Sequence, residues 1–552
     1  MLNAPPEILQ NIFFFAVSDT LVGPPKDLPN FHLICKASLS ALTGDSDHDT
    51  TPSVFYANLF AQKFDIRTPI RRLGRTEVTS NAREELRRRF IALRCFQRNQ
   101  WDECPLTDAL WIAYLMLRDS DSSQKNVKQI LWAGVPNFID NFVRRTLKGG
   151  GWPVHDEAIS LSLAIMWLLS SCASVIREPQ GSRDELQDLL APYVFAAFRY
   201  PLAHVPEYLF DVKKTEYDPI PGTSSSTVAS SYPPASPPPR DVRYFGAETQ
   251  KVDVPSLYVH AALLYFTRYE AKIRAYPDHI TTVKNKGRDQ VPEGPVYEDI
   301  EHYVSHCRTR YPEIPSDDGE PPALIGSNYK LGDLTGLWQG SWIVSRMEVY
   351  QQLGDTSDPP PNLPVISQTP LYLTLQEHYC LDMDSVVPSD KPENGTANAW
   401  LPEGCQLNHH SVSRRVPGVV KNKLIPNGIE ICNESGSFRK IYQTYRPGET
   451  SIDVSRRVVD IIITGKTDEQ HAAAWGAYHV RGRVRQADGL VMMLRESLAG
   501  LGDSLLRGYV TPSETLIGRM GGLSTGLAPA GWEATFSLNK DVIRGLPMRA
   551  AP

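Results

Sequence analysis

The chain has 552 residues, more than a single hydrophobic core usually holds, so we expect two or three domains. Hydrophobic residues make up 41% and charged residues 22%, which is the composition of an ordinary globular protein. The formal net charge of −6 gives no overall basic field and argues against a dedicated nucleic-acid-binding protein.

The eight cysteines are scattered along the chain, and no two of them form a Cys-x-x-Cys pair. This pattern predicts a reduced, intracellular protein of the cytoplasm, the nucleus or both, rather than a disulfide scaffold or a zinc module. Residues 158–176 carry no charge, but five serines interrupt them, so they predict a buried helix rather than a membrane span. We expect no metal, no other cofactor and no membrane contact.

The first forty residues predict two short helices. Pro5 and Pro6 suit a helix start, because the first turn does not need their missing N–H groups, and Glu7 adds a negative charge at the positive helix end. Asn30 suits the cap of a second helix that runs through residues 36–42. The apolar residues of the first helix recur so as to form one face: Ile8, Leu9, Ile12, Phe13 and Ala16.

The order of these residues, Pro-Pro-Glu-Ile-Leu, then Ile-Phe, then an apolar-Cys-Lys step at residues 33–36, resembles the F-box. The F-box is a small helical unit that attaches a protein to the Skp adaptor of a cullin-RING ubiquitin ligase. The resemblance implies the following adaptor-binding residues: Pro5, Pro6, Ile8, Leu9, Ile12, Phe13, Leu33, Ile34 and Cys35. Ala4 and Ser38 depart from the family, which usually has Leu and Trp at these positions. Without the resemblance, the same residues fit an ordinary N-terminal helix folded back on the next domain.

Residues 46–330 predict an all-α middle domain. Apolar residues spaced by three and four recur in several segments: residues 54–64, 82–97, 108–117, 127–131, 137–147, 184–198, 254–276 and 297–311. Residues 215–245 interrupt this pattern, because they are rich in Pro and Ser and hold little apolar surface to bury. They predict a disordered insertion within the helical domain.

From residue 333 the period of the apolar pattern changes from 3.6 to 2. Strands are predicted at residues 337–350, 371–379, 429–432, 438–445, 454–464, 475–485, 490–495, 505–510 and 515–519. Turn residues such as Asn427-Gly428 and Asp488-Gly489 separate them. About nine short strands predict an antiparallel β-barrel or sandwich over residues 333–545. The expected fold is therefore multidomain α+β, with an F-box over residues 1–45 ahead of the helical and β domains.

Short patterns in the β half carry a second resemblance. Gly336-Leu337-Trp338-Gln339-Gly340, the segment 479–490, Arg507-Gly508-Tyr509 and Gly518-Arg519 are similar to the C-terminal β domain of fungal F-box proteins and related receptors. The family is thought to present its substrate surface on this domain. Gly336-x-Trp338 also resembles the first strand of lipocalins, in which the Trp closes the barrel floor, and so supports a lipocalin-like barrel with a cavity.

Five residues are candidates for substrate binding: Trp338, Trp342, Arg481, Arg483 and Arg485. The two tryptophans share a face at period 2, and they either line a pocket or fill the core. The three arginines alternate on one strand and so face the same side. They form either an outward solvated face or a positive lining that binds carboxylates or phosphorylated segments of a target.

We expect the chain to be the substrate-recognition subunit of an SCF-type ubiquitin ligase. Its partners would be the Skp adaptor, the cullin scaffold and an unknown protein substrate. No nucleophile or acid–base set converges in the sequence, so we expect no catalysis by the chain itself. Two alternatives remain: a lipocalin-like ligand-binding protein whose N-terminal helices only pack internally, and an interaction protein that binds the adaptor without building a ligase.

Overall fold

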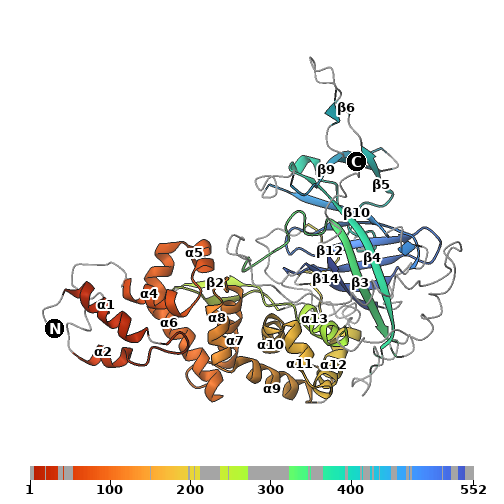
Figure 1. Ribbon diagram of the computed structural model, residues 1–552. Helices are drawn as coiled ribbons and strands as arrows, with labels where there is room; N and C mark the ends of the chain where they lie inside the picture. The colour runs from red at the N-terminus through yellow and green to blue at the C-terminus, as the bar shows by residue number, and fades with distance from the viewer. Residues whose placement is uncertain are drawn as a thin grey trace, which may run out of the picture.

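The structure is a computed structural model. It describes residues 5–34, 54–211, 237–270, 323–345, 365–410, 428–448, 457–523 and 533–540, apart from short gaps within these ranges and a few isolated residues outside them. The described part has helices in its N-terminal and middle regions and a closed eight-stranded antiparallel β-barrel in its C-terminal region. This confirms the multidomain α+β prediction. In Figure 1 the helices extend away from the barrel, and the N-terminal ones lie farthest from it.

Most of the helices follow the predicted apolar periodicity. Three differ from the prediction: residues 67–73 form a helix that was not predicted, residues 158–176 contribute to two helices instead of one, and Asn30 lies inside a helix instead of capping one. Their bounds are α1 (Pro6–Val17), α2 (Leu28–Ile34), α4 (Val54–Lys63), α5 (Arg67–Leu73), α6 (Arg75–Arg98), α7 (Leu106–Arg118), α8 (Lys125–Trp132), α9 (Val135–Leu147), α10 (Glu157–Leu169), α11 (Cys172–Arg177), α12 (Gln180–Phe195) and α13 (Leu257–Glu270). The segment 297–311, predicted as a helix, lies outside the described residues. Within the described part, no helix combines the length and the apolar character that crossing a membrane would need.

A buried charge network holds the helical body together around Arg89 of α6. Its guanidinium donates to Glu85 at 2.9 Å and to Asp119 at 3.3 Å, and Arg72 donates to the same Asp119 at 2.9 Å. The Tyr244 hydroxyl also donates to Asp119 at 2.9 Å. Tyr244 directly follows strand β1 (Arg240–Arg243), which pairs with β2 (Thr249–Val252), so the network fastens this hairpin to the helices.

The predicted insertion is only partly described. Residues 212–236 lie outside the described part of the chain. Residues 240–243, which the Pro- and Ser-rich composition assigned to the same insertion, form strand β1 instead. Val242 of this strand is buried in the helical core, which explains why the strand is ordered despite the prolines before it.

The barrel is an up-and-down arrangement of neighbouring antiparallel strands. The strands that close it are β3 (Gly336–Ser345), β4 (Val365–Cys380), β10 (Asp460–Lys466), β11 (Tyr478–Val484), β12 (Val491–Ser497), β13 (Ser504–Val510), β14 (Thr515–Gly522) and β15 (Glu533–Lys540). β15 pairs with β3, and β4 pairs with both β3 and β10, so the hydrogen-bonded ring is complete. Closure removes the open edges that a sandwich would leave, and it decides between the two predicted architectures.

A small sheet extends from β4 beside the barrel. β3 pairs with β4 as far as Leu375, and beyond it His378 and Tyr379 pair with β9 (Arg439–Thr444) on the same edge. β9 pairs with β8 (Gly428–Asn433), which pairs with β5 (Cys405–His410). Two further short strands, β6 (Ser413–Arg414) and β7 (Lys423–Leu424), pair with each other. Figure 1 shows β5, β6 and β9 above the barrel. β5 was not predicted, since Leu407 is the lone large apolar residue in its run.

Large apolar side chains fill the barrel. Inward positions that are at most 3% exposed include Trp338, Leu371, Leu373, Leu375, Ile461, Ile463, Val480, Val484, Val491, Met493, Leu506, Leu516, Met520, Phe536 and Leu538. The outer face of the barrel is apolar too where it meets the helices, because Met492, Leu505 and Ile517 belong to the same core cluster as α12 and α13. The helices therefore share one hydrophobic core with the outer face of the barrel, while the barrel interior forms a second core.

Two glycines allow neighbouring strands to approach closely at one point of the wall. Gly508 of β13 lies opposite Gly518 of β14. A Cβ atom on Gly518 would lie 2.1 Å from the carbonyl oxygen of Arg507 and 2.6 Å from the Cα atom of Gly508. Because both neighbours are backbone atoms, a side chain could fit only if the strands separated.

We expect Gly518→Ala to lower the free energy of unfolding by about 1–3 kcal/mol, as overpacking does in tight cores. Urea unfolding followed by circular dichroism measures this. Gly181→Ala is the matched control, because nothing lies within 4 Å of its added methyl group, and alanine is the better helix former by up to about 1 kcal/mol. Equal stability of the Gly518→Ala variant and the unaltered chain would contradict the close approach of the strands.

Candidate functional site

Helix α1 carries apolar residues on two faces. One face, made by Leu9, Phe13 and Val17, is at most 7% exposed and belongs to the helical core. Phe13 packs on Phe31 of α2 with ring centroids 4.6 Å apart. The spacing i, i+4, i+8 places these three side chains on one stripe, so this half of the amphipathic pattern is used inside the molecule.

The opposite face of α1 is apolar and exposed. Ile8 is 51%, Ile12 40% and Phe15 73% exposed, and they lie at i, i+4 and i+7 on one stripe. On the adjacent α2, Leu33 is 83% and Ile34 59% exposed. We call these five residues the N-terminal apolar surface. Large apolar side chains gathered on exposed helix faces are typical of a protein-binding site.

The sequence pattern assigned Ile8, Leu9, Ile12 and Phe13 to a single face, and the structure divides them into two pairs. At about 100° per residue these four positions span roughly 140° of the helix. An arc of that width reaches from the buried side of α1 to the exposed side. Phe15 was missed, although its position is within about 20° of Ile8 around the helix axis.

Buried hydrogen bonds hold the end of α1 against the helical body. The amide N–H of Gly23 donates to Gln129 Oε1 at 2.8 Å, and Gln129 Nε2 donates to the Leu21 carbonyl at 3.1 Å. Gln62 Nε2 donates to the Ser18 carbonyl at 3.0 Å. Gly23 has φ +82°, and a Cβ there would lie 2.9 Å from the Trp132 ring, so this turn requires glycine. α1 is thus joined to α4 and α8 by polar as well as apolar contacts.

The other predicted adaptor residues are placed in part. Pro5 is exposed and precedes the first turn of α1, and Pro6 is the first residue of the helix, as expected for prolines at a helix start. Cys35, together with the departures Ala4 and Ser38, lies outside the described residues. For the described positions, the adaptor-binding assignment stays a prediction.

Trp338 lies inside the barrel and fills it. The side chain is fully buried, and its Nε1 donates to the Leu334 carbonyl at 2.7 Å. Glu377 of β4 accepts hydrogen bonds from Tyr329, from the Gly332 N–H and from Thr335, and so holds residues 329–335 across this end of the barrel. Trp342, on the same face of β3, is partly buried against the same core.

Arg483 and Arg485 face outward from the barrel, as the strand alternation predicts, but neither is solvated. Arg483 is fully buried, and its Nε and Nη2 donate to the two oxygens of Asp460 at 2.9 and 2.8 Å. Its Nη2 also donates to the Val387 carbonyl at 2.7 Å, and its Cζ atom lies 3.8 Å from the centre of the Phe210 ring. The solvated-face interpretation is therefore wrong for Arg483.

Arg485 is also fully buried, at the junction with the helical domain. Its guanidinium makes a two-point contact with Asp488, Nε–Oδ1 2.8 Å and Nη2–Oδ2 2.6 Å. The remaining donors bond the carbonyls of Val205, Pro206 and Leu209 at 3.0, 2.7 and 2.6 Å. Every donor of the side chain is thereby used, and a solvated face is wrong for this residue as well.

Arg481 is the accessible member of the three arginines. Its side chain is 25% exposed, and it donates to Glu496 on β12 and to the Cys405 carbonyl, both at 3.0 Å. The structure therefore does not bring the five predicted substrate-binding residues together. Trp338 lies inside the barrel, Arg483 and Arg485 lie under covering segments, and Arg481 lies at the surface. Substrate binding by these residues stays a prediction.

Two more arginines join the barrel wall to the helices. Arg507 donates to Glu207 at 2.6 Å, and Arg519 lies with its Cζ atom 4.1 Å from the centre of the Tyr258 ring and donates to the Tyr200 carbonyl. The Tyr258 hydroxyl of α13 also bonds Thr535 at 2.9 Å. We call Arg485, Arg507 and Arg519 the junction arginines. The sequence pattern contained no signal for their acceptors in residues 200–209, which lie about three hundred residues away along the chain.

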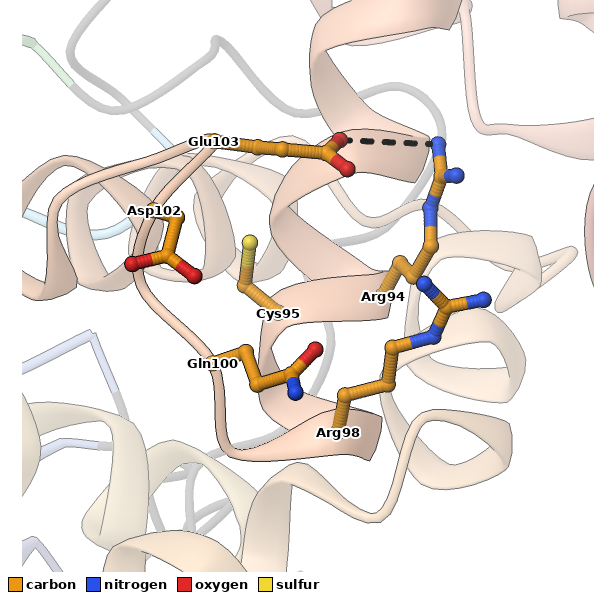
Figure 2. Close-up of a pocket in the computed structure, with 6 residues that line it drawn as sticks. All are labelled: Arg94, Cys95, Arg98, Gln100, Asp102 and Glu103. Atoms are coloured by element: carbon orange, nitrogen blue, oxygen red, sulfur yellow. Dashed lines mark ion pairs between the residues drawn. The ribbon is translucent and has the colours of Figure 1, made fainter.

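A shallow hollow of about 70 Å³ lies beside α6, where Arg94, Cys95, Arg98, Gln100, Asp102 and Glu103 line it (Figure 2). Its volume is roughly that of two water molecules, which is too small for a substrate. Burial, together with the nearby Glu103, raises the pKa of the Cys95 thiol, so the thiolate that a nucleophile needs is disfavoured. Arg94 and Glu103 approach to 3.9 Å at the rim.

Among the described residues, no three His, Cys, Asp or Glu side chains come together as metal ligands would. His378 illustrates why, since its two ring nitrogens bond the hydroxyls of Thr444 and Thr464 at 2.9 and 2.8 Å.

Comparison with known proteins adds nothing to this picture: no family model, curated protein or solved structure matches the chain.

We expect Asp488→Asn to lower the free energy of unfolding at pH 7 by about 3–5 kcal/mol, because it leaves the buried Arg485 without a counter-charge. Burial raises the pKa of Asp488, but the adjacent Arg485 outweighs it and holds that pKa below the ordinary value of 3.8. The stabilisation is thus fully present above about pH 4 and is lost as the pH falls through the folded-state pKa.

Urea unfolding of both proteins at pH 7, 5 and 3 measures the effect. The difference in the free energy of unfolding between the unaltered chain and the Asp488→Asn variant should be constant between pH 7 and 5 and should become smaller at pH 3. Glu103→Gln is the control, because it removes a surface carboxylate whose ion pair contributes at most about 1 kcal/mol. If this difference in the free energy of unfolding became larger at low pH, the pKa of Asp488 would not be lowered in the folded state, and the prediction would be wrong.

Proposed function

We propose that the chain is the substrate-recognition subunit of an SCF-type ubiquitin ligase, bound to the Skp adaptor through α1 and α2. The N-terminal apolar surface carries this proposal. Ile8, Ile12, Leu33 and Ile34 are among the residues that the F-box resemblance implies for adaptor binding, and all four are between 40% and 83% exposed. Apolar side chains in this position gain free energy when a partner covers them.

The attachment of α1 supports the same proposal. Leu9, Phe13 and Val17 hold the helix on the body, while Gln62 and Gln129 fix the chain that follows it. The exposed stripe is therefore presented on a held helix, and a partner would not have to order it first. Binding surfaces that are formed beforehand lose less conformational entropy on association.

The lipocalin-like alternative receives less support. A ligand-binding barrel needs interior space, whereas the inward positions here hold Trp338, Phe536 and other large apolar side chains. Target capture in the proposed receptor would instead use the outer surface or the rim of the barrel. Ubiquitin transfer would belong to the other subunits of the ligase.

We expect the double variant Ile8→Asp/Ile12→Asp to bind purified Skp adaptor at least about tenfold more weakly than the unaltered chain, because each carboxylate would be desolvated in an apolar interface. Both positions are exposed, so the fold should be kept, and circular dichroism checks this. Biolayer interferometry with immobilised adaptor measures the affinity.

Ile441→Asp is the matched control, since this isoleucine is 53% exposed on β9, in the β region of the chain. It should bind the adaptor as the unaltered chain does. Adaptor binding that survives in the Ile8/Ile12 variant, or that fails in the unaltered chain, would contradict the proposal. In the second case, the N-terminal helices would be an ordinary part of the helical body.

A further inference from the structure

The described residues at the two ends of the barrel differ in chemistry. The strand pairings of β3, β4, β10 and β11 place Trp338 and Val484 at the same end of the barrel. Residues 329–335 cover this end. Tyr478 and Arg495 lie at the opposite end, near the turn between β12 and β13. We call this opposite end the barrel mouth. Among the described residues, Tyr478, Arg495 and Ser504 give this end a polar and cationic side. At the other end, Trp338 and the Glu377 contacts with residues 329–335 give apolar packing and fixed hydrogen bonds.

Arg495 points into the barrel mouth. It alternates with Val491 and Met493, which face inward, and its neighbours in register are Val480 on β11 and Ser504 on β13. Its Cζ atom lies 3.3 Å from the centre of the Tyr478 ring. The guanidinium therefore lies over an aromatic face, and this contact restricts the directions that it can take.

Arg495 has no carboxylate partner among the residues that the structure describes. Nearby acids are used elsewhere: Glu496 binds Arg481, Asp503 accepts from the Ser497 N–H at 2.9 Å, and Glu533 binds Arg507. The Arg495 Nε and the Ser504 hydroxyl are buried without a hydrogen-bond partner. Burial lowers the pKa of Arg495 to about 10, which is the response of a desolvated cation that no anion compensates.

Exposed apolar side chains flank this cation. Leu498 and Leu501, on the β12–β13 turn, are 62% and 64% exposed. The turn is well fixed, because the Leu498 N–H donates to the Ala477 carbonyl at 3.0 Å and the Leu501 N–H to Ser497 Oγ at 2.9 Å.

The same turn reaches the aromatic wall of the mouth. A Cβ on Gly476 would touch both Leu501 and Tyr478 at 2.8 Å, which shows that the leucine and the aromatic ring adjoin. The mouth thus places a partly desolvated guanidinium next to an apolar rim.

We propose that the barrel mouth binds an extended segment of a target protein in which an Asp or Glu side chain lies beside a large apolar residue. The carboxylate would contact Arg495, and the apolar residue would pack on Leu498 and Leu501. Charge complementarity selects this occupant, since a carboxylate supplies the anion that the described surroundings of Arg495 lack and can accept two parallel hydrogen bonds from its guanidinium. The inference rests on the proposed function, because it names the chemistry of the captured target.

A peptide-display selection on the immobilised full chain tests the inference. The library consists of random eight-residue segments, of roughly the length that an extended chain needs to cross a barrel end, placed between fixed flanks so that no free chain end is offered. We expect enriched segments to contain Asp or Glu next to Leu, Ile, Phe or Met. A synthetic peptide of the enriched sequence, capped at both ends, should bind at least about tenfold more weakly to Arg495→Gln.

Three variants separate the contributions. Arg495→Lys keeps the charge but loses the two-point geometry, so its affinity should be intermediate. Leu498→Ser/Leu501→Ser should still select acidic residues but lose the apolar preference. Arg439→Gln, which removes an arginine that is 70% exposed on β9, should bind as the unaltered chain does. Circular dichroism of each variant confirms that it is folded.

The results of the peptide selection can be told apart from the results of the adaptor-binding experiment. Selection without acidic residues, binding that Arg495→Gln leaves unchanged, or no enrichment at all would overturn the inference. If the same protein still bound the Skp adaptor, the proposed function would stand with a different capture surface. If the adaptor did not bind but acidic segments were selected, the mouth would be a peptide site of a protein outside the ligase.

Discussion

The arrangement of the two large parts of this molecule depends on the burial of charged arginines between them. Arg485, Arg507 and Arg519 leave the barrel wall and bond carbonyls or carboxylates of residues 200–209. Removing a guanidinium from water costs several kcal/mol unless its donors are satisfied. Because the acceptors for Arg485 and Arg519 are backbone carbonyls, these bonds favour one relative orientation of the two parts. The contacts of α12 and α13 with β14 and β15 act in the same orientation.

The sequence predicts the architecture well where side-chain periodicity decides it. The helices from residue 54 to 195 appear where apolar residues recur at three and four, and the strands of the barrel wall appear where they alternate. β15 was missed although Ala534, Phe536 and Leu538 alternate with polar residues, so its signal was present. Barrel closure depends on this strand, which explains why the sequence alone did not exclude a sandwich.

The candidate sites are harder to predict, because they depend on what covers a residue. The alternation of Arg481, Arg483 and Arg485 gives the face correctly, but the segments that bury two of them come from residues 205–210 and 387–400. No local pattern encodes such contacts. The N-terminal helix is a second example. Its sequence predicts a wide apolar arc, but it does not predict which apolar residues pack inside the molecule and which stay exposed.

The chain of packed contacts between α1 and the barrel has a consequence for any pair of molecules bound at the two ends. The N-terminal apolar surface is held on α4 and α8, and the barrel is held by the junction arginines. The effective concentration at which two such partners meet would therefore be set by the distance between the two surfaces and not by the length of a linker. A flexible linker would allow many distances between the two bound molecules, whereas the packed helical body allows few. Shortening or bending the helical body would therefore change which parts of the second molecule can be reached, without altering either contact surface.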